Sequence, residues 1–317
     1  MYNLAPITLF VYNRPEHTHR TVEALLANKL AASSDLIVYA DGPKENASES
    51  QIQNIYAVRD YLSSLKGFRS IELHFSEKNI GCADSIIRGV TETVSRYGKV
   101  IVVEDDIVTH PFFLQFMNEA LNFYEQDKRI FTIGGTCNNI NIPSNYKYEV
   151  FLSYRSVSWG WATWQDRWSL ADWNIREYDI IRHPNWWKIH QFNRGGEELY
   201  EMLLMQLRGE IDAWDIRWEY CIHSHQGYTL VPTRSFATNN GMDGSGTHCG
   251  SSLGYAFAPM YDELNFNLRF IADVQPNRTI LKAYRDFFHV EKPYMPMTKR
   301  IKHVIISFLR KIHLNNR

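Results

Sequence analysis

The first 135 residues alternate between two hydrophobic patterns. Short runs rich in β-branched and aromatic residues predict five strands, at 7–13, 36–41, 70–75, 99–103 and 130–135. Longer amphipathic segments lie between most of them and predict helices near 16–30, 50–66, 81–97 and 110–125. Pro15 suits a first helical turn, and Gly98 suits a helix end. This order predicts an α/β fold with a Rossmann-like, doubly wound, mostly parallel sheet, which binds ligands at the carboxyl ends of its strands.

The pattern changes after residue 135. Regular periodicity gives way to aromatic-rich sequence at 153–168 and 183–192, and the Gly-, Ser- and Asn-rich segment 239–252 predicts a loop. We therefore expect a single domain with two halves and a tail, divided at 1–135, 136–270 and 271–317.

The composition is that of a folded protein. The 317 residues are 44% hydrophobic and 14% aromatic, which is enough to bury a full-sized core. The four cysteines lack CxxC spacing and suit reduced thiols in the cytosol. No run approaches the roughly 18 apolar residues of a membrane span, and the N-terminus lacks the pattern of an export signal. These observations predict a cytoplasmic protein.

The tail is the basic part of the chain. The chain has a formal net charge of −1, but residues 292–317 hold seven Lys and Arg and no Asp or Glu, leaving 27 basic against 35 acidic residues elsewhere. This acidic remainder argues against nucleic-acid binding. Apolar residues spaced by three and four from Ile301 to Ile312 predict a basic amphipathic helix. Such a helix suits an anionic membrane surface, and it equally suits docking onto the protein's own body or onto a second copy in a homodimer.

Three acids follow the fourth predicted strand, in "KVIVVEDDI". Glu104, Asp105 and Asp106 repel one another, and a solvated loop would tolerate them. At the ligand end of a sheet, a hard divalent cation would compensate their charge. Strand alternation predicts Glu104 and Asp106 on one face and Asp105 on the other.

The strand, "VVEDDI" and the next helix with "PFFLQFM" resemble the metal-binding DxD motif of GT-A glycosyltransferases, and most closely the inverting N-acetylglucosaminyltransferase I type. The resemblance covers about residues 5–255. It implies that Asp106 is the direct ligand of Mn²⁺ (or Mg²⁺). It also implies that Glu104 and Asp105 contact the sugar and the ribose or ordered water around the metal.

The resemblance extends upstream to the nucleoside contacts. It places Arg14 and Asp41 against the nucleoside, and Asn79 and Gly81 beside the ribose. A carboxylate can accept the imide N–H of uracil, which cytosine lacks, so Asp41 favours a uridine nucleotide. Both residues also have structural interpretations: Arg14 is typical of a surface ion pair or a helix cap, and Asp41 is typical of a turn.

The family's catalytic base is an aspartate that follows a tryptophan at the start of a helix. Trp214 and Asp215 in "AWDIRWEY" match that motif, so Asp215 is the expected base and Trp214 would help to wall the sugar site. Asp212 is the rival base, and Asp215 also suits a helix N-cap.

The sequence also suggests roles for further tryptophan and histidine residues. "VSWGWATW" resembles the family's Gly-Trp segment, so Trp159 and Trp161 are expected to border the donor sugar and acceptor. His248 lies in a segment that resembles the mobile loop over the donor, where it could reach the diphosphate or metal. His223 and His225, expected on one strand face, lack a third metal ligand and are expected to be structural.

The resemblance implies a metal-dependent transferase. It would move a sugar from a UDP-sugar (UDP-GlcNAc, UDP-GalNAc or UDP-Gal), bound by 1–135, to a hydroxyl of a glycan acceptor bound by 136–270. With the basic tail, a lipid-linked precursor of a surface polysaccharide is the expected acceptor. A retaining transferase and a non-catalytic carbohydrate-binding protein remain alternatives. A nucleotidyltransferase should show a Gly-rich phosphate loop after the first strand, and "VYNRPEH" has none.

Overall fold

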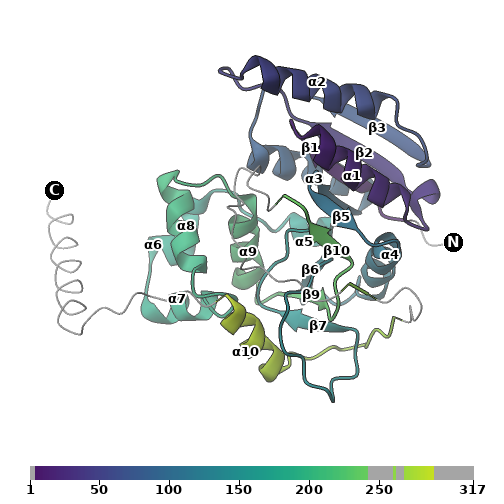
Figure 1. The fold of residues 1–317 in the computed structure, drawn as a ribbon. Helices are drawn as coiled ribbons and strands as arrows, with labels where there is room; N and C mark the ends of the chain where they lie inside the picture. Colours follow the sequence, from purple (N-terminus) through teal and green to yellow (C-terminus); the bar gives the residue numbers. More distant parts are fainter. Residues whose placement is uncertain (1–3, 242–259, 262–267, 289–317) are drawn as a thin grey trace, which may run out of the picture.

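The computed structural model describes residues 4–241, 260–261 and 268–288. An eight-stranded sheet with the order β3-β2-β1-β4-β8-β6-β9-β7 forms its centre (Figure 1). The strands of this sheet are β1 (Ile7–Val11), β2 (Asp35–Ala40), β3 (Ser70–Phe75), β4 (Lys99–Glu104), β6 (Ile130–Gly134), β7 (Val150–Ser153), β8 (Trp161–Trp164) and β9 (Tyr228–Pro232). A second, two-stranded sheet pairs β5 (Ile107–Thr109) antiparallel with β10 (Ala237–Asn239).

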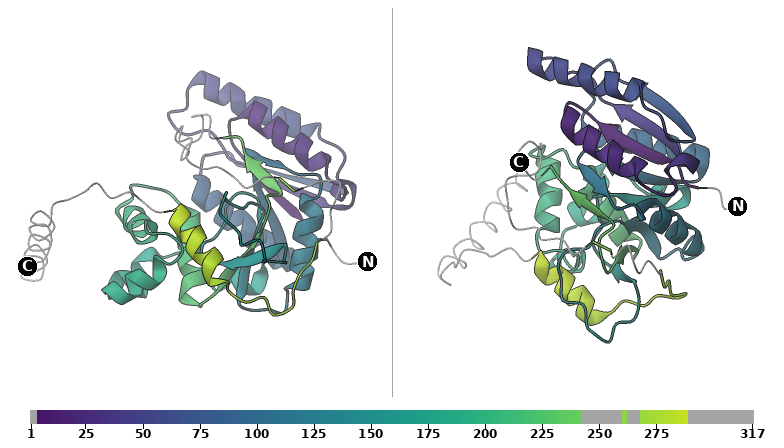
Figure 2. Two further views of the ribbon diagram at one scale, coloured as in Figure 1. Left: turned by 60° about the horizontal axis from the view of Figure 1, so that its bottom comes forward. Right: turned by 45° about the vertical axis from the view of Figure 1, so that its right-hand side comes forward.

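Helices cover both faces of the large sheet (Figure 1, Figure 2). Helices α1, α2 and α4 pack on one face, and α3, α5 and α9 pack on the other. The α-helices are α1 (Pro15–Leu26), α2 (Glu49–Ser63), α3 (Cys82–Tyr97), α4 (Phe113–Phe123), α5 (Gln165–Trp168), α6 (Asp179–Arg182), α7 (Trp186–Phe192), α8 (Leu199–Arg208), α9 (Trp214–Ser224) and α10 (Arg278–Phe287). Two short 3₁₀ helices are η1 (Ala31–Ser33) and η2 (Ile175–Glu177).

The first half confirms the predicted doubly wound arrangement. Strand β1 pairs parallel with β2 and β4, and β2 pairs parallel with β3. All five residues of β1 are buried, as a continuous apolar run requires when helices cover both faces of a parallel sheet. Pro15 occupies the first turn of α1, and Gly98 ends α3 in the left-handed conformation with φ +76°. The local signals of the sequence therefore set the boundaries of these helices.

The second half contains strands that the sequence did not predict. Strand β8 runs antiparallel between β4 and β6, so that Trp161 pairs with Val102 and Trp164 with Lys99. Strand β6 pairs parallel with β9, and β7 closes this edge antiparallel to β9. Because β8 is antiparallel, its first residue lies beside the carboxyl end of β4.

Two smaller clusters complete the described structure. Helices α6, α7 and α8 pack with α9, away from β1–β3 (Figure 1). Helix α10 packs Ile280 and Tyr284 against Phe151 of β7 and Val231 of β9. The predicted amphipathic helix at 301–312 lies outside the described residues. Within the described part of the chain, every helix is too short or too polar to span a bilayer.

Candidate active site

Arg14 joins two acids at the carboxyl edge of the sheet. It precedes α1, its Nη2 donates to Asp106 Oδ2 at 3.0 Å, and its Nε donates to Asp105 Oδ2 at 3.3 Å. Nη2 also forms an ion pair with Asp105 Oδ1. The expected alternation of faces is wrong here, because β4 ends at Glu104 and the two aspartates form a turn. Both carboxylates can therefore contact one guanidinium.

One cation faces three acids at this point. Burial raises the pKa of Glu104 well above its ordinary value, and the charges of Asp106 and Asp105 add to that rise. Burial also raises the pKa of Asp105, and Arg14 offsets only part of the rise. Burial by itself would lower the pKa of Arg14, but the two aspartates outweigh it and the pKa is raised. Burial and mutual repulsion therefore disfavour the charged forms of Glu104 and Asp105, even with Arg14 beside them.

The carboxylates at this site suit a divalent cation whose remaining ligands come from a bound substrate. Carboxylate oxygens are the groups that Mg²⁺ and Mn²⁺ prefer. Among the described residues, no cluster of three or more His, Cys, Asp or Glu side chains is assembled to hold a metal alone. Mg²⁺ is commonly bound by one or two carboxylates together with substrate phosphates. Asp106, which is 8% exposed and paired with Arg14, is a carboxylate that could take part in such a shared site.

Asp41 is surrounded by backbone amides. Its carboxylate accepts hydrogen bonds from the N–H groups of Gly42 at 2.8 Å, Ile80 at 3.0 Å and Gly81 at 3.2 Å. Burial raises its pKa, and these amides counter part of that rise. The Asn79 side chain donates to the Gly42 carbonyl at 3.0 Å. In this structure Asp41 therefore ties the end of β2 to the start of α3, and its expected contact with uracil stays a prediction.

Two glycines allow close approaches at the site. A Cβ on Gly241 would stand 2.3 Å from Asp106 Oδ2, and the neighbouring Asn240 N–H donates to the Asp106 carbonyl at 2.8 Å. Gly81 has φ +89°, and a Cβ there would lie 3.2 Å from Asp212 Oδ2. Sequence reasoning missed Gly241, although the Asn-Asn-Gly at the start of the predicted loop was a turn signal.

Helix α9 brings Asp215 toward the triple acid. The helix begins at Trp214, as the motif implied, with Ala213 rather than Asp215 at the N-cap. The charge of Asp215 contributes to the raised pKa of Glu104 and of Cys82, which places this carboxylate in the same electrostatic neighbourhood. Asp212 lies at the same edge, and its side chain is 58% exposed. The choice of base between the two aspartates stays a prediction.

The tryptophans expected to wall the sugar site lie inside the core. Trp161 is 0% exposed, Trp214 is 5% exposed, and their rings stack at 4.8 Å. Trp159 is partly buried against the hydrophobic cluster on the face of the sheet that α1, α2 and α4 cover. Since packing occupies the faces of Trp161 and Trp214, these rings fix α9 on β8 and so position Asp215 in this structure.

Glu219 is a buried acid that sequence reasoning missed. It lies one turn after Asp215 on α9, is 2% exposed, and accepts a hydrogen bond from the Ser156 N–H. Burial raises its pKa to about 7, the hydrogen bonds of Ser156 and the charge of Arg155 act against that rise, and Asp215 adds to it. The four-residue spacing of the two acids in "WDIRWE" was the available signal.

The expected strand around His223 and His225 is wrong. His223 belongs to α9 and His225 caps it, because Trp214, Trp218 and Ile222 repeat with helical spacing and are buried. Burial lowers the pKa of His223 to about 4. This neutral imidazole packs on aromatic rings, as a structural histidine does.

The remaining predictions concern the loop and the thiols. His248 and Cys249 lie outside the described residues. The other three cysteines, Cys82, Cys137 and Cys221, are free thiols in the described structure.

The chain was also compared with known proteins. No protein-family model matches it, and no curated protein matches it. Among solved structures, it is similar to S. aureus TarS 1-349, with a TM-score of 0.40 and 12% identity over 75% of this chain and 61% of that chain. A second structure of S. aureus TarS gives a TM-score of 0.36 and 10% identity over 73% of this chain and 36% of that chain. The chain thus spans less than two thirds of either structure, and both likenesses are weak.

Proposed function

We propose that the chain is a metal-dependent, inverting glycosyltransferase of the GT-A, N-acetylglucosaminyltransferase I-like type. Its donor is a UDP-sugar, with UDP-GlcNAc, UDP-GalNAc and UDP-Gal as candidates, and its acceptor is a hydroxyl of a glycan. One observation carries the proposal. Arg14 binds Asp105 and Asp106 at the carboxyl edge of the sheet, and Asp215 in the first turn of α9 lies near enough for its charge to act on the adjoining Glu104.

The acidic cluster suits the diphosphate side of the reaction. Asp106 would hold Mn²⁺ or Mg²⁺, and the bound metal supplies positive charge that offsets the charge developing on the departing UDP. Arg14 fixes the orientation of Asp105 and Asp106. Its Nη1 is buried and has no hydrogen-bond partner in the described structure, so it is a donor available to a phosphate oxygen.

Asp215 suits the acceptor side. A carboxylate within hydrogen-bond reach of the acceptor hydroxyl takes its proton as the oxygen attacks the anomeric carbon. The new C–O bond forms on the face opposite the leaving diphosphate, so the anomeric configuration inverts. Asp215 starts from a fixed position, because Trp214 and Ile216 on either side of it are buried.

Asp106→Asn tests the metal assignment. The variant should lose manganese-dependent UDP binding in calorimetry and keep the wild-type circular dichroism spectrum, and chelator should silence the wild-type enzyme. Asp60→Asn on α2 is the matched control, because Asp60 is exposed and distant in sequence from the cluster. Full activity in chelator would overturn the metal assignment.

Asp215→Asn tests the base. Donor affinity should stay near the wild-type value while turnover falls about a hundredfold or more. If Asp212→Asn gives that pattern instead, the role passes to Asp212. An NMR spectrum of the product reports the anomeric configuration, and retention would favour the retaining alternative. Glycan binding without any hydrolysis of UDP-sugars would favour a non-catalytic carbohydrate-binding protein.

The proposed setting is the cytoplasmic face of a membrane, with a lipid-linked glycan as acceptor. This proposal rests on the basic amphipathic sequence at 301–312. Truncation after Pro296 should release the protein from anionic vesicles and slow transfer to a lipid-linked acceptor, but spare donor hydrolysis. Aggregation of the truncated chain would instead indicate that the tail packs on the protein or in a homodimer interface.

A further inference from the structure

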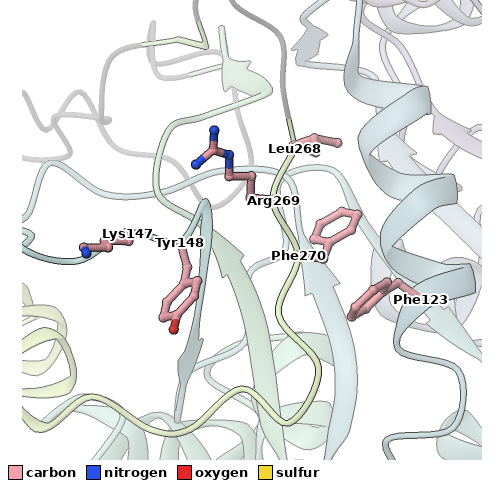
Figure 3. Close-up of a pocket in the computed structure, with 6 residues that line it drawn as sticks. All are labelled: Phe123, Lys147, Tyr148, Leu268, Arg269 and Phe270. Carbon is pink, nitrogen blue, oxygen red and sulfur yellow. The ribbon is translucent and has the colours of Figure 1, made fainter.

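A second concave site lies beside the outer strands of the large sheet. Its volume is about 620 Å³, within the range of roughly 300–1,000 Å³ that is usual for ligand pockets. Three segments line it: the end of α4, the residues before β7, and the described segment 268–270 (Figure 3). The lining residues are Phe123, Lys147, Tyr148, Leu268, Arg269 and Phe270. None of them belongs to the candidate active site.

Aromatic rings form the apolar part of this pocket. The rings of Phe123 and Phe270 lie 5.4 Å apart, and Phe270 also contacts Tyr124 of the core at 5.6 Å. Phe123 is nevertheless 47% exposed and Tyr148 is 41% exposed. Exposed aromatic faces supported by core packing are suited to stacking against the C–H face of a sugar ring, because both surfaces are flat and apolar.

Two cations also line the pocket. Lys147 and Arg269 are exposed, and neither side chain forms an ion pair or hydrogen bond with another residue in the described structure. Asp273, four residues after Arg269 in the sequence, is paired with Arg129 at 3.0 Å. Figure 3 shows Arg269 on the side of its segment that faces Lys147 and Tyr148, while Phe270 points to Phe123. The pocket thus combines an apolar wall with two cations that have no ion-pair partner among the described residues.

We propose that this pocket binds an acidic saccharide. A sugar ring would stack on the exposed aromatic faces, and its carboxylate would pair with Arg269 and Lys147. A simple anion site would not need the aromatic rings, and a neutral saccharide site would not need two unpaired cations. This second saccharide site goes beyond the proposed transfer reaction, and a growing acidic polymer could be held there while its end is extended elsewhere.

The test uses full-length protein and trigalacturonate, with its methyl ester as a neutral probe of the same ring structure. Binding is followed by saturation-transfer NMR titration, and inorganic phosphate is added as a competitor. Two variants are compared with the wild type. The charge variant is the double substitution Lys147→Gln with Arg269→Gln, which removes both positive charges, and Tyr148→Ala removes one ring. The control is Lys66→Gln with Arg278→Gln, since these are exposed cations outside the pocket. Thermal unfolding verifies that each variant is folded.

The expected result is binding of trigalacturonate that weakens at least tenfold in the charge variant and in the methyl ester, weakens in Tyr148→Ala, and is unchanged in the control. Absence of binding, equal binding of acid and ester, or equal loss in the control overturns the proposal. Full displacement by phosphate with no effect of Tyr148→Ala identifies a simple anion site and also overturns it. Hydrolysis of UDP-sugars is measured in parallel. It tests the proposed transferase function independently of saccharide binding at this pocket.

Discussion

Replacing Glu219 by glutamine should stabilise the protein increasingly as the pH rises. The side chain is 2% exposed, and burial raises its pKa from 4.5 to about 7. Glutamine has the same shape and keeps an oxygen that can accept the Ser156 N–H, but it never ionises. The substitution therefore removes the charge and retains the hydrogen bond.

The direction of this pH dependence follows from how tightly the folded and unfolded states bind the Glu219 proton. The folded protein holds the Glu219 proton more tightly than the unfolded chain does, so ionisation removes stability as the pH rises from 4.5 to about 7. Each unit of pKa difference corresponds to about 1.4 kcal/mol. The variant should thus exceed the wild type in free energy of unfolding by less than about 1 kcal/mol at pH 5 and by about 3 kcal/mol at pH 8.

Urea unfolding followed by tryptophan fluorescence measures this difference, because Trp218 next to Glu219 is buried. The quantity compared is the difference in free energy of unfolding between variant and wild type at each pH, because the contributions of the other titrating groups cancel in that difference. Glu16→Gln is the control: its side chain is 86% exposed, so its difference from the wild type should stay within about 0.5 kcal/mol at both pH values.

Two results would refute this reasoning. A difference that is the same at pH 5 and pH 8 would mean that Glu219 titrates near its ordinary pKa, with Arg155 compensating its charge. A variant that is less stable than the wild type at pH 8 would mean that the ionised carboxylate is needed to hold Ser156.

Three further substitutions probe the site. Gly241→Ala places a Cβ 2.3 Å from Asp106 Oδ2 and should weaken manganese-dependent UDP binding at least tenfold in calorimetry, while unchanged binding would show that the backbone after β10 can shift to make room. Asp41→Asn turns an N–H group toward backbone donors and should cost about 1–3 kcal/mol in urea unfolding; no loss would show that the amides find other acceptors. Gly42→Ala brings a Cβ within 2.5 Å of the Lys78 carbonyl carbon and should lower stability by about 1–3 kcal/mol, which a wild-type midpoint would contradict.

The parallel half of the fold could be predicted because its signals are local. Each buried strand is a short apolar run, and markers such as Pro15 and Gly98 set helix ends. The carboxyl edge then follows from topology, which is why the position of Glu104 at the end of β4 could be inferred.

The second half depends on pairing between distant segments. Strand β8 is four residues long, and its tryptophans are equally typical of a core helix, so only its contacts with β4 and β6 define it. The buried positions of Trp161 and Trp214 follow from the same pairing. Glu219 was missed because an acid on a helix is usually exposed, and only the fold shows that Ser156 and the core surround it.

The antiparallel placement of β8 also constrains how the chain can fold during synthesis. When the ribosome has made only residues 1–135, β4 has β1 on one side and lacks its partner on the other. Its apolar edge is then open to pairing with other chains. At about 5–20 residues per second, β8 follows within several seconds, and this edge of β4 stays unpaired on the nascent chain until then. A shortened protein intended to remain monomeric should therefore extend at least through Trp164.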